Sequence, residues 1–137
     1  MTITMPAREL DRLGDSGLST ADLANIDDDV QGRVVYDRLG EEIGTVDDLL
    51  VSRQLLEAPF AIVRWGGILG LGRQERLVPM EIVTVQPNAL VVERDREAVQ
   101  TAPALREELE GDDAEAYYAA VSGHYGVAPY WTRVSNR

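Results

Sequence analysis

The sequence predicts an all-β core: a small antiparallel β-barrel of about six strands, with short helical extensions at both ends. Short runs of β-branched and aromatic residues recur between residues 29 and 95. Turn residues separate these runs at short spacing, and no helical pattern suited to a crossover lies between them. We therefore divide the chain into an N-terminal extension (1–28), a barrel (29–95) and a C-terminal extension (96–137).

The first half of the barrel is predicted to contain three strands. Residues 34–36 are β-branched and aromatic, and the turn at 37–40 ends this run. Residues 41–51 follow as an extended segment whose apolar residues do not alternate cleanly. A bulge or bend at Gly44 would reset the phase, as at the corners of small barrels. Residues 60–65 form the third strand.

The second half follows the glycine-rich segment 66–72, with strands expected at 76–78, 82–85 and 90–93. Pro79 stops the first of these strands, because proline cannot donate to the ladder. One apolar face of all six strands should form the core: Val35, Ile43, Val46, Leu49, Ile62, Val78, Val83 and Val91.

The N-terminal extension carries signals for two short turns. Pro6 suits the first turn of a helix that includes Leu10 and Leu13 and ends at Gly14. Ser19 or Thr20 can cap another turn.

The C-terminal extension predicts a turn capped by Asp95 and a helix that opens with a capping box, Asp112 to Glu115, and stops at Gly123. Aromatic residues then crowd the end of the chain. A disordered tail is normally poor in aromatics, so we expect this one to dock, either on its own barrel or on a partner.

Four motifs together resemble the PRC-barrel family, named for the barrel of the photosynthetic reaction-centre H subunit. They are Gly-Arg-Val-Val-Tyr-Asp at 32–37, the segment 40–51, the loop 66–72 and Leu-Val-Pro at 77–79. The segment Leu-Gly-Asp-Ser-Gly-Leu at 13–18 and the Tyr/Pro/Trp-rich C-terminal end also resemble small free-standing bacterial members of the family.

The resemblance implies a barrel that recurs as an adaptor and shares no catalytic residue. In the ribosome maturation factor such a barrel contacts a ribosomal protein, and in the reaction centre it caps membrane-embedded subunits. We find in this sequence neither the transmembrane helix of the latter nor the preceding domain of the former. Neither role is therefore carried over.

Charge and composition limit the chemistry that we expect. The net charge is −11, and acids outnumber arginines in all three segments, which disfavours contact with nucleic acid or anionic lipid. All 13 basic residues are Arg, so the chain offers no Schiff-base or phosphate-loop Lys. No Cys and no signal-peptide pattern are present, and the cytoplasm is the expected location.

Four features have residues typical of chemical sites, and we interpret all four as structural. The loop 66–72 lies between strands and lacks Gly-Lys-Ser/Thr, which argues against a nucleotide loop. The cluster Asp27–Asp29 lacks calcium-loop spacing, and Asp47 and Asp48 should point to opposite faces of a strand, where they cannot easily share one ion. His124 is the only His and lies in a predicted tail. Trp65 has no basic groove beside it for stacking on bases.

We therefore expect no catalytic residue, metal site or cofactor, and a non-enzymatic protein-interaction or scaffold module that forms a homodimer. A basic protein partner is the second expectation, since it would complement the acidic surface. The alternatives are a ribosome-assembly adaptor and a metal-dependent enzyme that uses the Asp clusters. The expected partner-contact residues are apolar or aromatic: Ile68, Leu69, Leu71, Tyr125, Tyr130 and Trp131.

Overall fold

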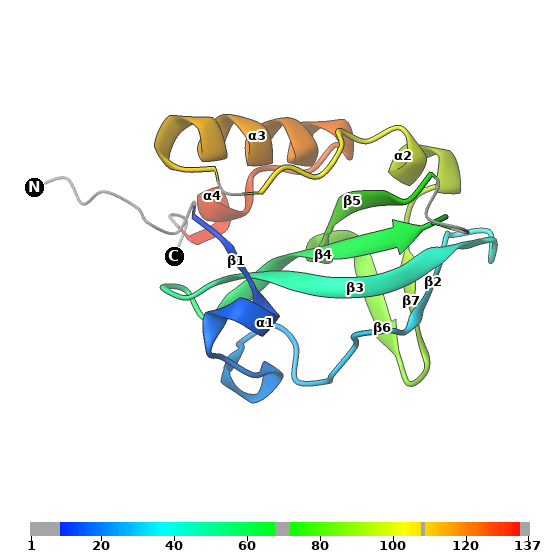
Figure 1. Cartoon of the computed structure of the whole chain (residues 1–137), viewed down its shortest axis with the longest axis horizontal. Helices are drawn as coiled ribbons and strands as arrows, with labels where there is room; N and C mark the ends of the chain where they lie inside the picture. The colour runs from blue at the N-terminus through cyan, green and yellow to red at the C-terminus, as the bar shows by residue number, and fades with distance from the viewer. Residues whose placement is uncertain (1–8, 68–71, 108, 135–137) are drawn as a thin grey trace, which may run out of the picture.

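One mixed β-sheet carries helices on two sides, as the computed structural model in Figure 1 shows. The structure describes residues 9–67, 72–107 and 109–134. The strands are β1 (Asp11–Arg12), β2 (Val34–Tyr36), β3 (Glu42–Ser52), β4 (Glu57–Trp65), β5 (Gln74–Pro79), β6 (Val83–Gln86) and β7 (Ala89–Val92). The helical elements are α1 (Leu13–Ser16), η2 (Thr20–Asp22), η4 (Met80–Ile82), α2 (Arg96–Gln100), α3 (Gly111–His124) and α4 (Tyr130–Val134).

The strand order is β5-β4-β3-β2-β7-β6, and β1 adds to β3. The six predicted strands are present, but the prediction of a wholly antiparallel sheet is wrong, because β2 and β7 run parallel from Val34↔Ala89 to Tyr36↔Val91. That prediction relied on the absence of a crossover helix. Here the strands β3 to β6 carry the chain from β2 to β7, so no helix is needed.

The sheet is not closed, because β5 and β6 do not pair in the described part of the chain. Pro79 ends β5 without an N–H to donate, and the 3-10 turn η4 then turns the chain into β6. The outer edge of β5 is taken instead by the C-terminal extension. Leu105 N donates to Glu75 O at 3.2 Å, and Arg76 bridges to Ala104. An extension therefore covers an edge that a closed barrel would pair.

The long strand β3 accommodates its irregular apolar pattern through shifts in register. Against β2 the shift falls at Ile43, because Val35 pairs with Gly44 while Tyr36 pairs with Glu42. Against β4 further shifts fall between Val46 and Asp48 and between Leu50 and Ser52. The predicted irregularity near Gly44 is confirmed, and it is one of three.

Gly44 itself is required by the close approach of β4. A Cβ at this position would press on the carbonyl group of Arg64, with the carbonyl carbon at 2.9 Å. That carbonyl belongs to an inner strand and cannot move without disturbing the β3–β4 ladder.

We expect Gly44→Ala to lower the free energy of unfolding by about 1–3 kcal/mol. Urea denaturation measures this change. Gly123→Ala is the matched control, because a Cβ there meets no atom within 4 Å. Since Gly123 lies within α3, that variant should be neutral or slightly more stable. Equal stability of Gly44→Ala and the wild type would contradict the close packing of β3 on β4.

The core is shared by the sheet and both extensions. Six of the predicted core residues are buried: Val35, Ile43, Val46, Leu49, Ile62 and Val78. Val83 and Val91 are only half-buried, and the phase predicted for β7 is wrong. Leu90 and Val92 point inward instead, since a one-residue slip in a continuous apolar run reverses which side chains face the core.

The N-terminal extension departs from its predicted helix. Asp11 and Arg12 form β1 by pairing with Val51 and Leu50, and α1 then runs from Leu13 to Ser16. The predicted stop at Gly14 is therefore wrong. The second prediction is confirmed: Ser19 caps η2 in a capping box with Asp22.

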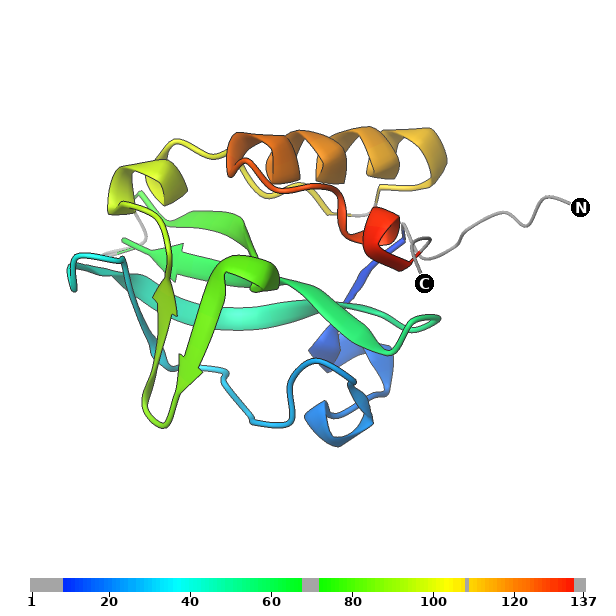
Figure 2. The ribbon, with the colours of Figure 1, turned by 180° about the vertical axis from the view of Figure 1, so that it is seen from behind.

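The C-terminal extension lies across the sheet, with α3 above β4 and β5 in Figure 1 and again in the reverse view of Figure 2. The helix begins at Gly111 rather than Asp112, continues through Gly123 and ends at His124. At α2, Arg96 N donates to Asp37 at 2.9 Å, while Asp95 pairs with Arg38. No helix in the described residues combines the length and the apolarity that crossing a bilayer requires.

Candidate functional site

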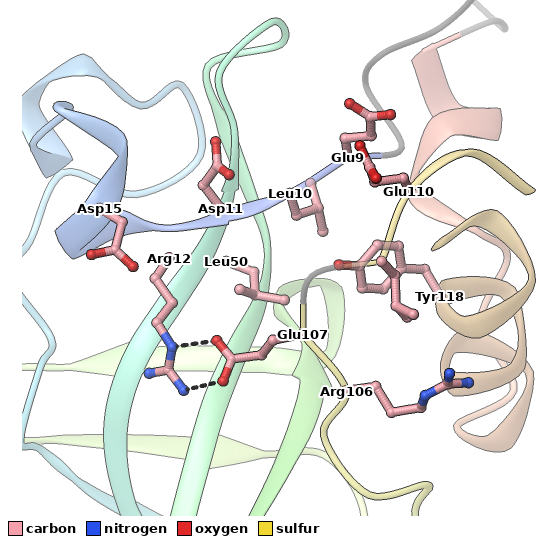
Figure 3. Close-up of a pocket in the computed structure, with 11 residues that line it drawn as sticks. Glu9, Leu10, Asp11, Arg12, Asp15, Leu50, Arg106, Glu107, Glu110 and Tyr118 are labelled. Atoms are coloured by element: carbon pink, nitrogen blue, oxygen red, sulfur yellow. Dashed lines mark hydrogen bonds and ion pairs between the residues drawn. The ribbon is translucent and has the colours of Figure 1, made fainter. Parts of the chain in front are cut away.

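An open groove of about 690 Å³ lies between β1 and the segment that leads into α3. Figure 3 shows its residues arriving from four separate parts of the chain: the N-terminal segment, β3, the 106–110 segment and α3. Five carboxylates line it: Glu9, Asp11, Asp15, Glu107 and Glu110. The apolar part of its lining consists of Leu10, Leu50, Leu109 and the ring of Tyr118. The groove thus combines an acidic surround with an apolar floor.

Arg12 holds the two sides of the groove together. Its Nε donates to Glu107 Oε1 at 2.7 Å and its Nη2 to Glu107 Oε2 at 3.2 Å, which is a bidentate pair (Figure 3). Its Nη1 also donates to Asp47 Oδ2 at 2.9 Å, on β3. One guanidinium therefore ties β1 to the central sheet and to the C-terminal extension, and most of its charge is neutralised.

Asp47 and Glu75 form the inner half of this network. Arg73 Nη2 lies 3.6 Å from both carboxylates, and Arg64 Nη1 lies 3.4 Å from Asp47. Burial raises the pKa of Asp47, but the hydrogen bonds with Arg12 and Glu75 outweigh it, so the net pKa lies below 3.8. Burial and then the neighbouring Asp47 carboxylate raise the pKa of Glu75 above 4.5. The two carboxylates thus have opposite effects on stability as the pH changes.

We expect Asp47→Asn to lower the melting temperature at pH 7, because the ionised carboxylate stabilises the folded state. The lowered pKa means that this stabilisation is present above pH 3.8 and is lost as the pH falls below it. Glu75→Gln should be neutral or stabilising at pH 7. The raised pKa of Glu75 gives stability only below pH 4.5, and this is lost as the pH rises.

Thermal unfolding between pH 2 and pH 8 tests both changes. Glu97→Gln, an exposed substitution on α2, is the control and should follow the wild type. A melting temperature for Asp47→Asn equal to that of the wild type at pH 7 would show that the network contributes nothing to stability.

The far wall of the groove is an aromatic stack. The Tyr118 ring stacks on Phe60 at 5.5 Å, and Tyr117 lies 5.4 Å from Tyr118. The Tyr117 hydroxyl donates to Ala104 O at 2.8 Å and accepts from Arg106 N at 3.1 Å. These two bonds attach the 104–106 segment to α3.

The aromatic residues expected to contact a partner lie largely inside their own chain. Tyr125 and Tyr130 are 3% and 4% exposed, and Trp131 is half-buried. The Tyr125 hydroxyl donates to Leu77 O at 2.8 Å, and Tyr130 meets Phe60 edge-on at 6.0 Å. Of the two docking alternatives, the structure shows the tail on its own sheet. The other expected contact residues lie outside the described residues: Ile68, Leu69 and Leu71.

The acidic clusters serve separate local roles. Asp28 pairs with Arg33 at 3.2 Å, and Asp29 accepts from Gln31 N. Asp47 points to the Arg12 network, whereas Asp48 accepts from Gly14 N, so these neighbours face opposite ways as predicted. In the described residues no three His, Cys, Asp or Glu side chains gather in a way that would hold a metal ion.

His124 and the glycine loop are also accounted for by local contacts. The Nε2 atom of His124 lies 2.7 Å from Ala98 O, and its ring meets Tyr125 edge-on at 5.1 Å. In the loop, Gly66 has a φ of +76° and a Cβ there would crowd Gly72, which fits the prediction that its glycines serve backbone geometry.

No local pattern in the sequence indicates the groove. Its carboxylates are exposed and dispersed along the chain, where they resemble ordinary solvated charge. Arg12 lies in a mixed stretch of charged and apolar residues that does not mark it, and its three carboxylate partners are more than thirty residues away. Only the fold brings them together.

Comparison with known proteins agrees with the architecture. A family model described as the PRC-barrel domain matches residues 25–99, which is more than half of the chain. The match extends a few residues beyond both predicted barrel boundaries and includes α2 up to Val99. A comparison with curated proteins found no match. Because this family model covers more than half of the sequence, the chain belongs to the PRC-barrel family.

Proposed function

We propose that this chain is a non-enzymatic protein-interaction module whose groove between the two extensions receives a basic partner protein. The observation that carries the proposal is the groove's composition, five carboxylates around an apolar floor. Complementary charge steers partners together, and buried apolar contacts then hold them. Two of the carboxylates, Asp15 and Glu110, form no ion pair with any described residue. Their charge is therefore available to a partner.

Affinity capture from a lysate of the native host tests this proposal. The double variant Asp15→Asn/Glu110→Gln removes two charges from the groove. Asp27→Asn/Glu93→Gln removes the same two charges from exposed positions outside it. We expect the wild type and the control to retain the same basic protein and the groove variant to lose most of it. Equal retention by all three proteins would refute the role of the groove.

The identity of a captured protein separates two forms of the proposal. A basic ribosomal protein would favour the ribosome-assembly adaptor, and any other protein would favour a scaffold of another process. The acidic surface supports neither nucleic acid nor anionic lipid as the direct partner.

Self-association remains a prediction. Because Tyr125 and Tyr130 are committed to the core, the expected contact residues that we retain for it are Trp131 and those of the 66–72 loop. The expected result is a homodimer that tightens with salt, because the net charge of −11 on each chain opposes association. Sedimentation equilibrium measures it, and a mass of 15.1 kDa across the micromolar range would refute it.

A further inference from the structure

The Tyr118 hydroxyl sits at the tip of a buried side chain and faces the groove without a hydrogen-bond partner among the described residues. Tyr118 is 4% exposed, yet no described residue forms a hydrogen bond with its hydroxyl. Figure 3 shows this oxygen pointing away from α3 and into the groove. The ring is held in place by packing, while the oxygen is accessible from the groove and is not a buried unpartnered atom. Its hydrogen-bonding capacity is therefore open to a ligand in the groove.

The charge around this hydroxyl selects a cation. Five carboxylates line the groove against two arginines, and Arg12 is already neutralised by Glu107 and Asp47. Burial, and then the charges of Tyr117, Asp11 and Glu107, raise the pKa of Tyr118 to about 12. The hydroxyl therefore stays neutral at physiological pH and can accept a hydrogen bond from a cationic donor.

The floor of the groove selects an organic cation rather than a metal ion. Leu50 is buried, and Leu10 and Leu109 are half-buried beside it. The carboxylates do not converge, since no metal-holding group of three occurs among the described residues. A charged group on an aliphatic stem matches this arrangement, because the stem covers the leucines while the charge reaches the acidic surround.

We infer that the groove binds the side chain of a lysine or arginine presented by the partner polypeptide, with the Tyr118 hydroxyl accepting a hydrogen bond from the cationic head. The aliphatic stem lies on Leu50, and Asp15 and Glu110 face the charge. This inference rests on the proposed protein-binding role and names the chemistry that the groove recognises. It also assigns Tyr118 a recognition role besides packing on Phe60.

The test is a titration of the full-length, ¹⁵N-labelled protein followed by backbone amide chemical shifts. The probe is the peptide acetyl-Ala-Leu-Lys-Leu-Ala-amide at low salt. Its matched control replaces the lysine by norleucine, which keeps the stem and removes the ammonium. We expect saturable shifts at Leu50, Leu109 and Glu110, and binding about tenfold weaker for the norleucine peptide. Added salt should weaken the lysine peptide alone.

Tyr118→Phe keeps the ring that stacks on Phe60 and removes only the hydroxyl. It should weaken the lysine peptide about three- to tenfold and leave the norleucine peptide unchanged. Glu110→Gln, at an exposed position, should weaken the lysine peptide without affecting the fold, and Glu93→Gln should have no effect. Retained dispersion of the amide spectrum shows that each variant is folded.

Equal binding of both peptides, or shifts spread over the acidic surface and insensitive to Tyr118→Phe, would overturn the inference. The outcome is separable from that of the capture experiment. Capture of a protein that is insensitive to groove variants would leave a protein-binding role and remove this site. Specific peptide binding without any captured protein would leave the site and remove the proposed role.

Discussion

A chain truncated after Gly123 is expected to be largely unfolded at room temperature. The truncation removes Tyr125 and Tyr130, which are 3% and 4% exposed and pack on Leu77 and Phe60. Deleting one buried aromatic side chain typically costs about 3–5 kcal/mol, and a whole domain is stable by only about 5–15 kcal/mol. The Arg94 guanidinium also loses its acceptor, Tyr125 O, at 2.7 Å.

Circular dichroism and urea denaturation measure this effect. A chain ending after Val134 is the control and should unfold like the full-length protein, because it retains every contact named above. A cooperative transition near that of the wild type in the chain ending at Gly123 would show that the aromatic tail is not part of the core. The tail would then be free to contact a partner, as the sequence alone also allowed.

Leu49→Ala should lower the free energy of unfolding by about 2–5 kcal/mol. Leu49 is 2% exposed on β3, the strand that pairs with β1, β2 and β4. The residual cavity would lie at the centre of the sheet, where its neighbours are held by three ladders and cannot collapse easily.

Leu39→Ala is the matched control for this substitution. Leu39 is 70% exposed in the turn before β3, so its truncation should change the stability by less than about 0.5 kcal/mol. Urea denaturation compares both variants with the wild type. A loss below about half a kcal/mol for Leu49→Ala would place Leu49 outside the core.

The six predicted strands lie close to the observed ones, because each is a compact apolar run ended by turn residues. The two-residue strand β1 was missed, since Asp11 and Arg12 show no apolar alternation and pair only because the fold brings them to Val51 and Leu50. The phase of β7 was missed because four consecutive apolar residues fit either register.

Local sequence patterns could not predict which distant strands pair with each other. The parallel β2–β7 contact joins residues 55 positions apart, and no feature of either strand specifies the partner. The covering of the β5 edge likewise depends on Leu105 and Ala104, which belong to an extension predicted to lie outside the barrel. The extensions complete the sheet and its core, so they are part of the domain.

For the candidate site, too, the sequence predicted the general chemistry but not which residues come together. The acidic character of the chain and the expectation of a basic partner came from composition alone. The position of the groove could not be predicted from composition, because it depends on Arg12 linking β1 to Glu107 and on Tyr118 facing Leu50 from α3.

Hydrogen–deuterium exchange of the protein with and without its captured partner tests the central claim that the groove is the contact surface. We expect slower exchange in peptides that cover residues 9–16 and 109–118, which line the groove, and unchanged exchange in the β6–β7 hairpin. Protection confined to that hairpin, with no change in the two groove segments, would contradict the account.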